Sequence, residues 1–368
     1  MARIHAFRAG TPNLNRIENI PEFFDTCKSS YREYYEENLF DQDRKEALYL
    51  YQIDKGTEKQ TGLLCTLDLN DYIEGQVVPH EKTLAAKRKH MQHLFEERQA
   101  HIKPAMLTFP ARDAIKELMI NTRESADLIY QTQYQQEIHR VWRVDHPKTI
   151  RQFEKLFQEQ IPKTYIADGH HRTEASSELF LEDLHLRPKS KLQYLLVALF
   201  SSDQLQIHEF HRIIYSFNGL SKKQLLKAIE QSFSIEPSKK PVRPKKKHRI
   251  GLFIGNEWYI LKAKRSILQS GPSGIVLDVH LVNRYILSDV LNIHDVSHDN
   301  RVQYLEGPKG LKALEKKVRK ESEAFGLTLF PIDFEAFRQV VDAGELLPPK
   351  STYFEPRMRN GFITQRIE

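Results

Sequence analysis

The residues of this chain best suited to chemistry form one short segment, Asp168-Gly169-His170-His171-Arg172. A carboxylate, two imidazoles and a guanidinium surround a glycine, which lets the backbone approach a ligand closely. The segment separates a strand-like run from a helix-like run, so we expect a strand-to-helix turn. Free amides at the start of a helix attract anions, and the imidazoles and Arg172 add donors. The segment therefore predicts a phosphate site.

A polar turn whose imidazoles cap the helix is the alternative to a phosphate site. Adjacent helical residues such as His170 and His171 point about 100° apart. Joint capture of one metal ion by this pair would therefore be awkward. We prefer phosphate binding to a structural turn, and a zinc site comes after both.

Two further segments carry reactive residue types. We expect Glu81 in the first turn of a helix that continues to about residue 101, where the helix dipole favours an acid. The same carboxylate could accept the proton of an attacking hydroxyl. Lys350-Ser351-Thr352 follows two prolines, which make a stiff lead-in, and it would bind a carboxylate or phosphate or form a solvent loop.

The surrounding elements alternate between strand-like and helix-like patterns without a regular repeat, which indicates a mixed α/β or α+β fold. Strands are expected at residues 47–53, 62–69, 125–134, 139–144, 163–167, 192–200, 207–215, 250–254 and 257–263. Helices are expected at residues 81–101, 111–120, 149–160, 172–184, 222–233, 280–291, 310–325 and 334–343. Gly255-Asn256 predicts a hairpin turn, and Ser221 predicts a helix cap.

Composition narrows the class of protein. With 368 residues, 40% hydrophobic and 28% charged, the chain is long enough for two domains or lobes. It has no run long and apolar enough for a membrane span and no secretion-signal pattern at its start. Its two cysteines, Cys27 and Cys65, suggest a reduced, cytoplasmic protein.

The net charge of +6 comes largely from residues 237–249, which are rich in Lys, Arg and Pro and contain no acid. We interpret this segment as an exposed basic linker or loop, preferred over an RNA or DNA contact. The chain has no GxGxxG and no Walker-A loop, which weakens the usual dinucleotide and P-loop interpretations.

Taken together and in order, these motifs resemble a widespread family of bacterial proteins of long-unassigned function. The resemblance rests on residues 79–83, 165–172, 210–212 and 343–354 and spans nearly the whole chain. That family is similar to the free L-serine kinases, which share the Pro-His-Glu, Asp-Gly-His-His-Arg and Pro-Lys-(Ser/Thr)-Thr segments. The chain departs from the family pattern at residues 11–16 and 86–89, around Asn13 and Lys87, which bears on substrate identity and on activity itself.

The resemblance implies a ParB/sulfiredoxin-like nucleotide-binding core and a second α/β lobe closing over a cleft. It makes Glu81 the base toward the acceptor hydroxyl. It implies catalytic roles for Glu81, Asp168 and His170. It implies that the nucleotide phosphates bind at Gly169, His170, His171, Arg172 and Thr173. The substrate would bind at His80, Lys350, Ser351 and Thr352.

The leading hypothesis is therefore a kinase that moves phosphate from ATP or ADP to L-serine or a similar hydroxy acid. Mg²⁺ would bridge the phosphates, with Asp168 as a ligand. A nucleotide-sensing regulator that contacts DNA, or a relative that binds ligand without turnover, are the alternatives. The expected lobes are residues 1–236 and 250–368, joined by the basic segment at 237–249.

Overall fold

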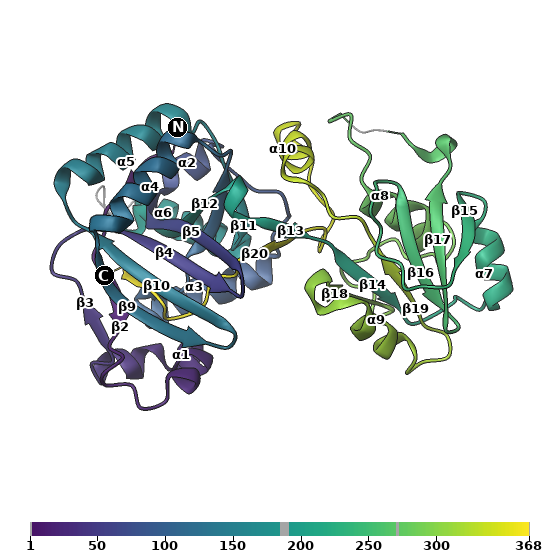
Figure 1. Ribbon diagram of the computed structural model, residues 1–368, viewed down its shortest axis with the longest axis horizontal. Coiled ribbons are helices and arrows are strands. Elements are labelled where there is room, and N and C mark those ends of the chain that lie inside the picture. The colour runs from purple at the N-terminus through teal and green to yellow at the C-terminus, as the bar shows by residue number, and fades with distance from the viewer. Residues whose placement is uncertain (1, 185–190, 270–271, 368) are drawn as a thin grey trace. The chain divides into compact units, whose positions relative to one another are not determined.

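The computed structural model describes residues 2–184, 191–269 and 272–367 and consists of two compact units of mixed α+β structure (Figure 1). The first unit is Met1–Gln206 together with Pro356–Glu368, and the second is Ile207–Glu355. This division differs from the expected boundary at residue 236. The difference arises because residues 210–214 and 233–238 form strands that pair within the sheet of the second unit.

The first unit contains most of the elements. Its strands are β1 (Ile4–His5), β2 (Ala9–Pro12), β3 (Phe40–Gln42), β4 (Leu48–Lys55), β5 (Glu58–Asp68), β6 (Val77–Val78), β7 (Ala100–His101), β8 (Ala105–Phe109), β9 (Asp127–Tyr134), β10 (Glu137–Val144), β11 (Thr164–Asp168), β12 (Tyr194–Ser201) and β21 (Thr364–Arg366). Its helices are α1 (Ile20–Glu36), α2 (Leu69–Ile73), α3 (Ala85–Arg98), α4 (Asp113–Ser125), α5 (Pro147–Gln160) and α6 (His170–Leu184).

A large sheet with the order β6-β11-β8-β12-β5-β4-β10-β9 forms the centre of the first unit, and β1 joins it beside β5. Its middle strand β12 runs parallel to β8 and antiparallel to β5. Both of its faces are buried, as its near-continuous apolar sequence predicts. Ile115 of α4, Phe153 and Phe157 of α5, and Phe180 of α6 share one hydrophobic core with this sheet. In Figure 1, α4 and α5 lie side by side.

The last residues of the chain return to the first unit. Strand β21 pairs with β2 through Gln365 and Ala9, and with β7 through Gln365 and His101. Phe362 is buried and stacks on Phe24 of α1 at a ring distance of 4.0 Å. Residues far apart in the sequence therefore complete the same unit.

The second unit is built on one six-stranded sheet with the order β15-β17-β16-β19-β14-β18. Its strands are β13 (Gln206–His208), β14 (Phe210–Ile214), β15 (Phe233–Ser238), β16 (Arg249–Ile254), β17 (Glu257–Ala263), β18 (Val302–Glu306), β19 (Phe325–Thr328) and β20 (Tyr353–Glu355). Its helices are α7 (Lys222–Ile229), α8 (Asp278–Val282), α9 (Gly310–Val318) and α10 (Phe334–Asp342), and a π-helical stretch, Asn283–Ser288, continues α8. Strands β13 and β20 pair where the chain enters and leaves this unit.

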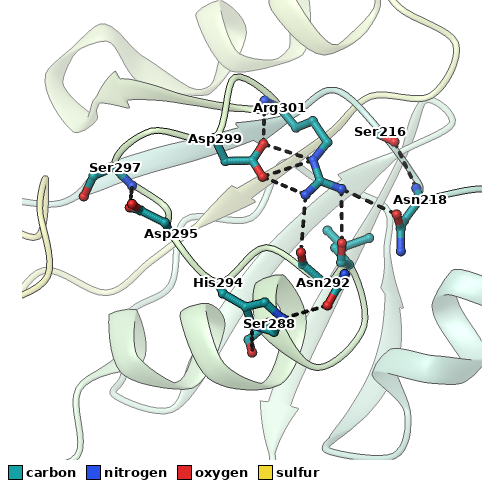
Figure 2. A network of polar contacts seen from close by, with 10 residues as sticks. Ser216, Asn218, Ser288, Asn292, His294, Asp295, Ser297, Asp299 and Arg301 are labelled. Carbon is teal, nitrogen blue, oxygen red and sulfur yellow. Dashed lines mark hydrogen bonds and ion pairs between the residues drawn. The ribbon is translucent and has the colours of Figure 1, made fainter.

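A polar network centred on Arg301 fixes the loop after this π-helical stretch (Figure 2). The Arg301 guanidinium donates to the Asp299 carboxylate at 2.6 to 3.2 Å. It also donates to the backbone oxygens of Leu291 at 3.2 Å and Asn292 at 3.4 Å, and to the side chain of Asn218 at 3.5 Å. Since its charge and donors are already matched, we assign Arg301 a structural role.

Most expected elements are present, and local signals explain the accurate ones. The hairpin of β16 and β17 turns at Gly255 and Asn256, both at positive φ, as the sequence predicts. Ser221 caps α7 in a full capping box with Gln224. The hairpin of β4 and β5 is also confirmed.

Four expected helices are too long, and one expected strand is broken. Helix α3 ends at Arg98, because Ala100 and His101 form strand β7. Helix α7 ends at Ile229 and α9 at Val318, because Phe233 and Phe325 belong to strands that pair in the sheet. Helix α8 gives way to a π-helical stretch at Asn283. The strand expected at residues 207–215 is divided between β13 and β14. Within the described residues, the structure contains no helix with the length and hydrophobicity needed to cross a membrane.

Candidate active site

The segment with the richest chemistry lies at the junction of β11 and α6, so the predicted strand-to-helix turn is confirmed. Strand β11 ends at Asp168, and α6 begins at His170. Gly169, between them, has a φ of +104°, and a Cβ there would come within 2.7 Å of Arg172 Nη2 and 3.2 Å of the Ala105 Cα. The turn therefore needs a glycine for both its backbone angle and its close packing.

Three cationic side chains surround the Asp168 carboxylate. Arg172 Nη2 donates to Oδ2 at 3.0 Å, Arg357 Nη1 donates to Oδ1 at 2.7 Å, and Lys103 Nζ lies 3.5 Å from Oδ2. Arg172 also donates to the backbone oxygen of Pro104 at 3.2 Å. All four charged side chains are partly exposed. The cluster therefore combines excess positive charge with access to solvent.

Burial and the neighbouring charges together shift the pKa values in this cluster. Burial would raise the pKa of Asp168, but Arg172, Lys103 and Arg357 together hold that pKa well below its usual range. Burial and the guanidinium of Arg172 lower the pKa of Lys103 to about 8, although Asp168 opposes the shift. Repulsion from Arg172 and Arg357 contributes to the lowered pKa of Lys103, and a bound anion would reduce this repulsion.

This environment suits an anion and does not suit a protein-held Mg²⁺. The sequence hypothesis gives Asp168 a metal-binding role, but both of its oxygens already accept from or face cations. Among the described residues, no group of three His, Cys, Asp or Glu side chains could hold a metal ion. We therefore derive no step through a metal held by Asp168.

The two predicted histidines bind the neighbouring Pro-His-Glu segment. The backbone N–H of His80 donates to His170 Nε2 at 3.4 Å, and the N–H of Leu84 donates to His171 Nε2 at 3.1 Å. The His80 and His170 rings meet edge to face at 4.4 Å. These contacts bring together two motifs that lie about ninety residues apart in the sequence.

Both buried imidazoles at this contact are uncharged near neutral pH. Burial lowers the pKa of His80 to about 4 and the pKa of His170 well below its ordinary value. His170 Nε2 accepts a hydrogen bond from the His80 backbone, so this nitrogen does not donate to a phosphate. His170 thus helps to hold in place the segment that carries Glu81.

The expectation that Glu81 lies in the first turn of a helix is wrong. Helix α3 begins at Ala85, and Glu81 lies in the non-helical segment before it. The reason is that side chains of α6 hold this segment: His171 accepts from Leu84, and Thr83 bonds to Glu174. Glu81 is half-buried and lies in the sequence between His80 and Thr83, which both contact α6.

Thr173 of α6 is fully buried, and its hydroxyl donates to the backbone oxygen of Gly169 at 3.2 Å. The Phe-His-Arg motif and Lys350, Ser351 and Thr352 lie in the second unit. Arg212 of β14 is fully buried; it donates to the backbone oxygens of Phe210 at 2.6 Å and Lys350 at 3.4 Å. The Lys350 ammonium lies 5.5 Å from the centre of the Phe210 ring. The structure therefore brings the Phe-His-Arg motif into contact with Lys350, and each unit contains two of the four sequence motifs.

The basic segment at residues 237–249 lies between β15 and β16 and includes the end of β15. It is largely exposed, as predicted, but two of its cations have acidic neighbours. Lys247 Nζ lies 3.0 Å from Asp333, and Arg243 Nη2 lies 3.2 Å from Glu209. These pairs reduce the charge that the segment could offer to a nucleic acid.

Sequence reasoning missed Lys103 and Arg357. Lys103 directly precedes Pro104 and the buried strand β8, a position at a strand end that could have drawn attention. Arg357 gives no such signal, because it reaches Asp168 only through the return of the chain to the first unit.

Comparisons with known proteins place the chain as follows. A family profile described as a protein of unknown function, DUF1015, matches residues 9–283. No curated protein matches the chain in sequence. Among solved structures, SbnI with a C-terminal truncation from Staphylococcus aureus is 12% identical, with 81% of this chain and 85% of that chain covered and a TM-score of 0.43.

A mutant free serine kinase in complex with ADP is 11% identical, with 81% of this chain and 91% of that chain covered and a TM-score of 0.41. A conserved hypothetical protein from Pyrococcus furiosus is 12% identical, with 81% and 94% covered and a TM-score of 0.39.

Proposed function

The chain belongs to the DUF1015 family, and for this member we propose a phosphotransferase that moves phosphate from a nucleotide to the hydroxyl of a small molecule. The single observation that carries the proposal is the cationic cluster on Asp168 at the start of α6, bound through His170 and His171 to the segment of Glu81. Anion-binding donors and a general base are the two parts that phosphoryl transfer needs from a protein.

The nucleotide phosphates would bind at the Asp168 junction. The first amides of α6 point toward its N-terminus, where the helix dipole favours negative charge. Lys103, Arg172 and Arg357 would share their charge between Asp168 and the incoming phosphate. Asp168 would thereby keep three long side chains aligned before the ligand arrives, which reduces the entropy lost on binding.

Glu81 would act as the base in the transfer. The acceptor oxygen forms a bond to the terminal phosphorus, the bond from that phosphorus to the nucleotide oxygen breaks, and the acceptor proton passes to the Glu81 carboxylate. ATP or ADP would serve as the donor, and a magnesium ion would enter with its phosphates. The motifs shared with the free L-serine kinases support L-serine or a related hydroxy acid as the acceptor.

A Glu81→Gln variant tests the proposal. The amide keeps the size of the side chain but cannot take the proton, so the rate of phosphate transfer should fall at least about a hundredfold. Binding of ADP should be unchanged. The measurement is phosphorylated product from L-serine and a panel of hydroxy acids with ATP or ADP and magnesium, next to ADP affinity by calorimetry.

Glu96→Gln is the matched control, since Glu96 is an exposed acid on the neighbouring helix α3. It should transfer phosphate at the wild-type rate. Transfer by Glu81→Gln at that rate would remove Glu81 from the mechanism. Binding of nucleotide without any product across the panel would overturn the transferase itself and leave a ligand-binding protein.

A further inference from the structure

The second unit contains a cavity that the proposed transfer does not use. It measures about 30 Å³, the space of roughly one water molecule or one ammonium group. Its walls are mainly apolar and include Leu277, Val279, Leu329, Ile332 and Leu347. Four polar side chains also line it: Glu209, Lys247, Asp278 and Ser351. The cavity therefore combines a small volume with two acids.

Glu209 is buried in an unusual way for a carboxylate. It is 2% exposed, and neither of its oxygens makes a hydrogen bond. The backbone of Gly307 packs against Glu209. A Cβ atom added to Gly307 would come within 2.9 Å of the Glu209 carboxyl carbon. A desolvated carboxylate without hydrogen bonds is costly, and such a group in a native structure calls for a ligand or a function.

The basic side chains near Glu209 do not supply the missing hydrogen bonds. Arg243 Nη2 lies 3.2 Å from Oε1 without the geometry of a hydrogen bond, and the Arg243 side chain is 52% exposed. His211 Nε2 lies 3.8 Å from the same oxygen, but burial lowers the pKa of His211 to about 4, so the ring is neutral. Lys247 is paired with Asp333 at 3.0 Å.

Asp278 and Ser351 add two more acceptors. Asp278 is 7% exposed; its Oδ1 accepts from the backbone N–H of His248 at 2.7 Å, whereas Oδ2 has no hydrogen-bond partner. Burial raises the pKa of Asp278 to about 6, so the group is mostly charged at neutral pH. Ser351 donates its hydroxyl proton to the backbone oxygen of Pro348. Toward the cavity the Ser351 oxygen can therefore only accept.

We propose that this cavity binds the ammonium group of a small organic amine. An ammonium group has three donors and no acceptor, and it would find acceptors on Glu209, Asp278 and Ser351. Because this volume takes only the ammonium group, the carbon atoms of the amine would lie outside it. Magnesium or calcium is a poorer match, because these ions require about six or more oxygen ligands. The inference concerns the second unit alone and does not depend on phosphate transfer.

Binding of n-propylammonium to the full chain, without nucleotide, tests this site. Ligand-observed NMR should show saturable binding in about the millimolar range expected for so small a ligand. Propionate and 1-propanol, which have the same size but the wrong charge, should not compete. Glu209→Gln and Asp278→Asn should each weaken binding at least about tenfold, because each removes a charge-assisted hydrogen bond.

The control is Glu236→Gln, which removes an exposed acid from the same unit and should leave the affinity unchanged. A second readout is thermal stability without ligand. Glu209→Gln should raise the melting temperature, since it neutralises a buried charge, while the exposed Arg243 stays solvated without its neighbour.

Three outcomes would overturn the inference. They are no saturable binding of propylammonium by the wild type, equal affinity in the wild type and Glu209→Gln, and a Glu209→Gln variant that melts lower or does not fold. The last outcome would show that Glu209 serves as the structural partner of Arg243.

Discussion

Lys103 is the residue whose charge state should control phosphate affinity. Its pKa is lowered to about 8, so the side chain is charged below that pH and neutral above it. A phosphate binds the charged form better. The affinity for ADP should therefore fall by up to about tenfold between pH 7 and pH 9, because one charged contact is lost.

Lys103→Arg supplies the matched variant, because an arginine keeps its charge throughout this range. Calorimetry with ADP across the pH range should show a decline for the wild type and a flat profile for Lys103→Arg. An equal decline in both would assign the pH dependence to another group.

At this scale the sequence identified residue types but not their partners. Asp168, His170 and Arg172 were found because they are neighbours in the chain. Lys103 and Arg357 reach the same carboxylate from 65 positions before and 189 positions after it, and no local pattern encodes such a contact. Glu209 is distinguished in the sequence only by its place in the strand expected at residues 207–215, since burial without hydrogen bonds is a property of the folded state.

The turn between β11 and α6 is the element that sets the geometry of the candidate site. Gly169→Ala would strain a φ of +104° and also push a methyl group against Arg172 and Ala105. We expect a loss of more than about 2 kcal/mol in the free energy of unfolding, since the backbone strain alone costs roughly 1–2 kcal/mol. ADP affinity should also fall, because Arg172 can no longer hold its position.

Gly56→Ala separates strain from the clash. Gly56 also has a positive φ, +62°, but a Cβ there would meet nothing within 4 Å. This variant should lose roughly 1–2 kcal/mol of stability and keep full ADP affinity. Denaturant unfolding and calorimetry on both variants measure the difference, and equal ADP affinities would mean that the Arg172 position does not matter for binding.

The elements also show where local patterns give accurate predictions. The turn at Gly255 and the cap at Ser221 were predictable because each depends on a few adjacent residues. The start of α3 at Ala85 was not, because residues of α6 hold the preceding segment in a non-helical form. Tertiary contacts override helix propensity in such places.

For the whole molecule, two separate hydrophobic cores mean that a mutation in one core should destabilise only the unit that contains it. Phe362→Ala removes a ring that packs against Phe24, Tyr134 and His139 in the first unit. We expect a loss of about 3–5 kcal/mol in the free energy of unfolding of that unit. Hydrogen exchange should then be faster in residues 2–184, 191–206 and 356–367 and unchanged in the second unit.

Phe253→Ala provides the opposite case, because Phe253 is buried in the core of the second unit. Its effect on hydrogen exchange should be confined to residues 207–269 and 272–355. Faster exchange throughout the chain in either variant would show that the two units unfold as one.

The return of the C-terminal segment to the first unit also has a consequence for biosynthesis. A ribosome makes Arg357, Phe362 and β21 after the second unit, so the first unit stays incomplete while the second is synthesised. Asp168 meets its third cation only after residues 207–355 have been made. Chains that terminate before Arg357 would thus lack a complete Asp168 site and the charge pattern on which we base the proposed activity.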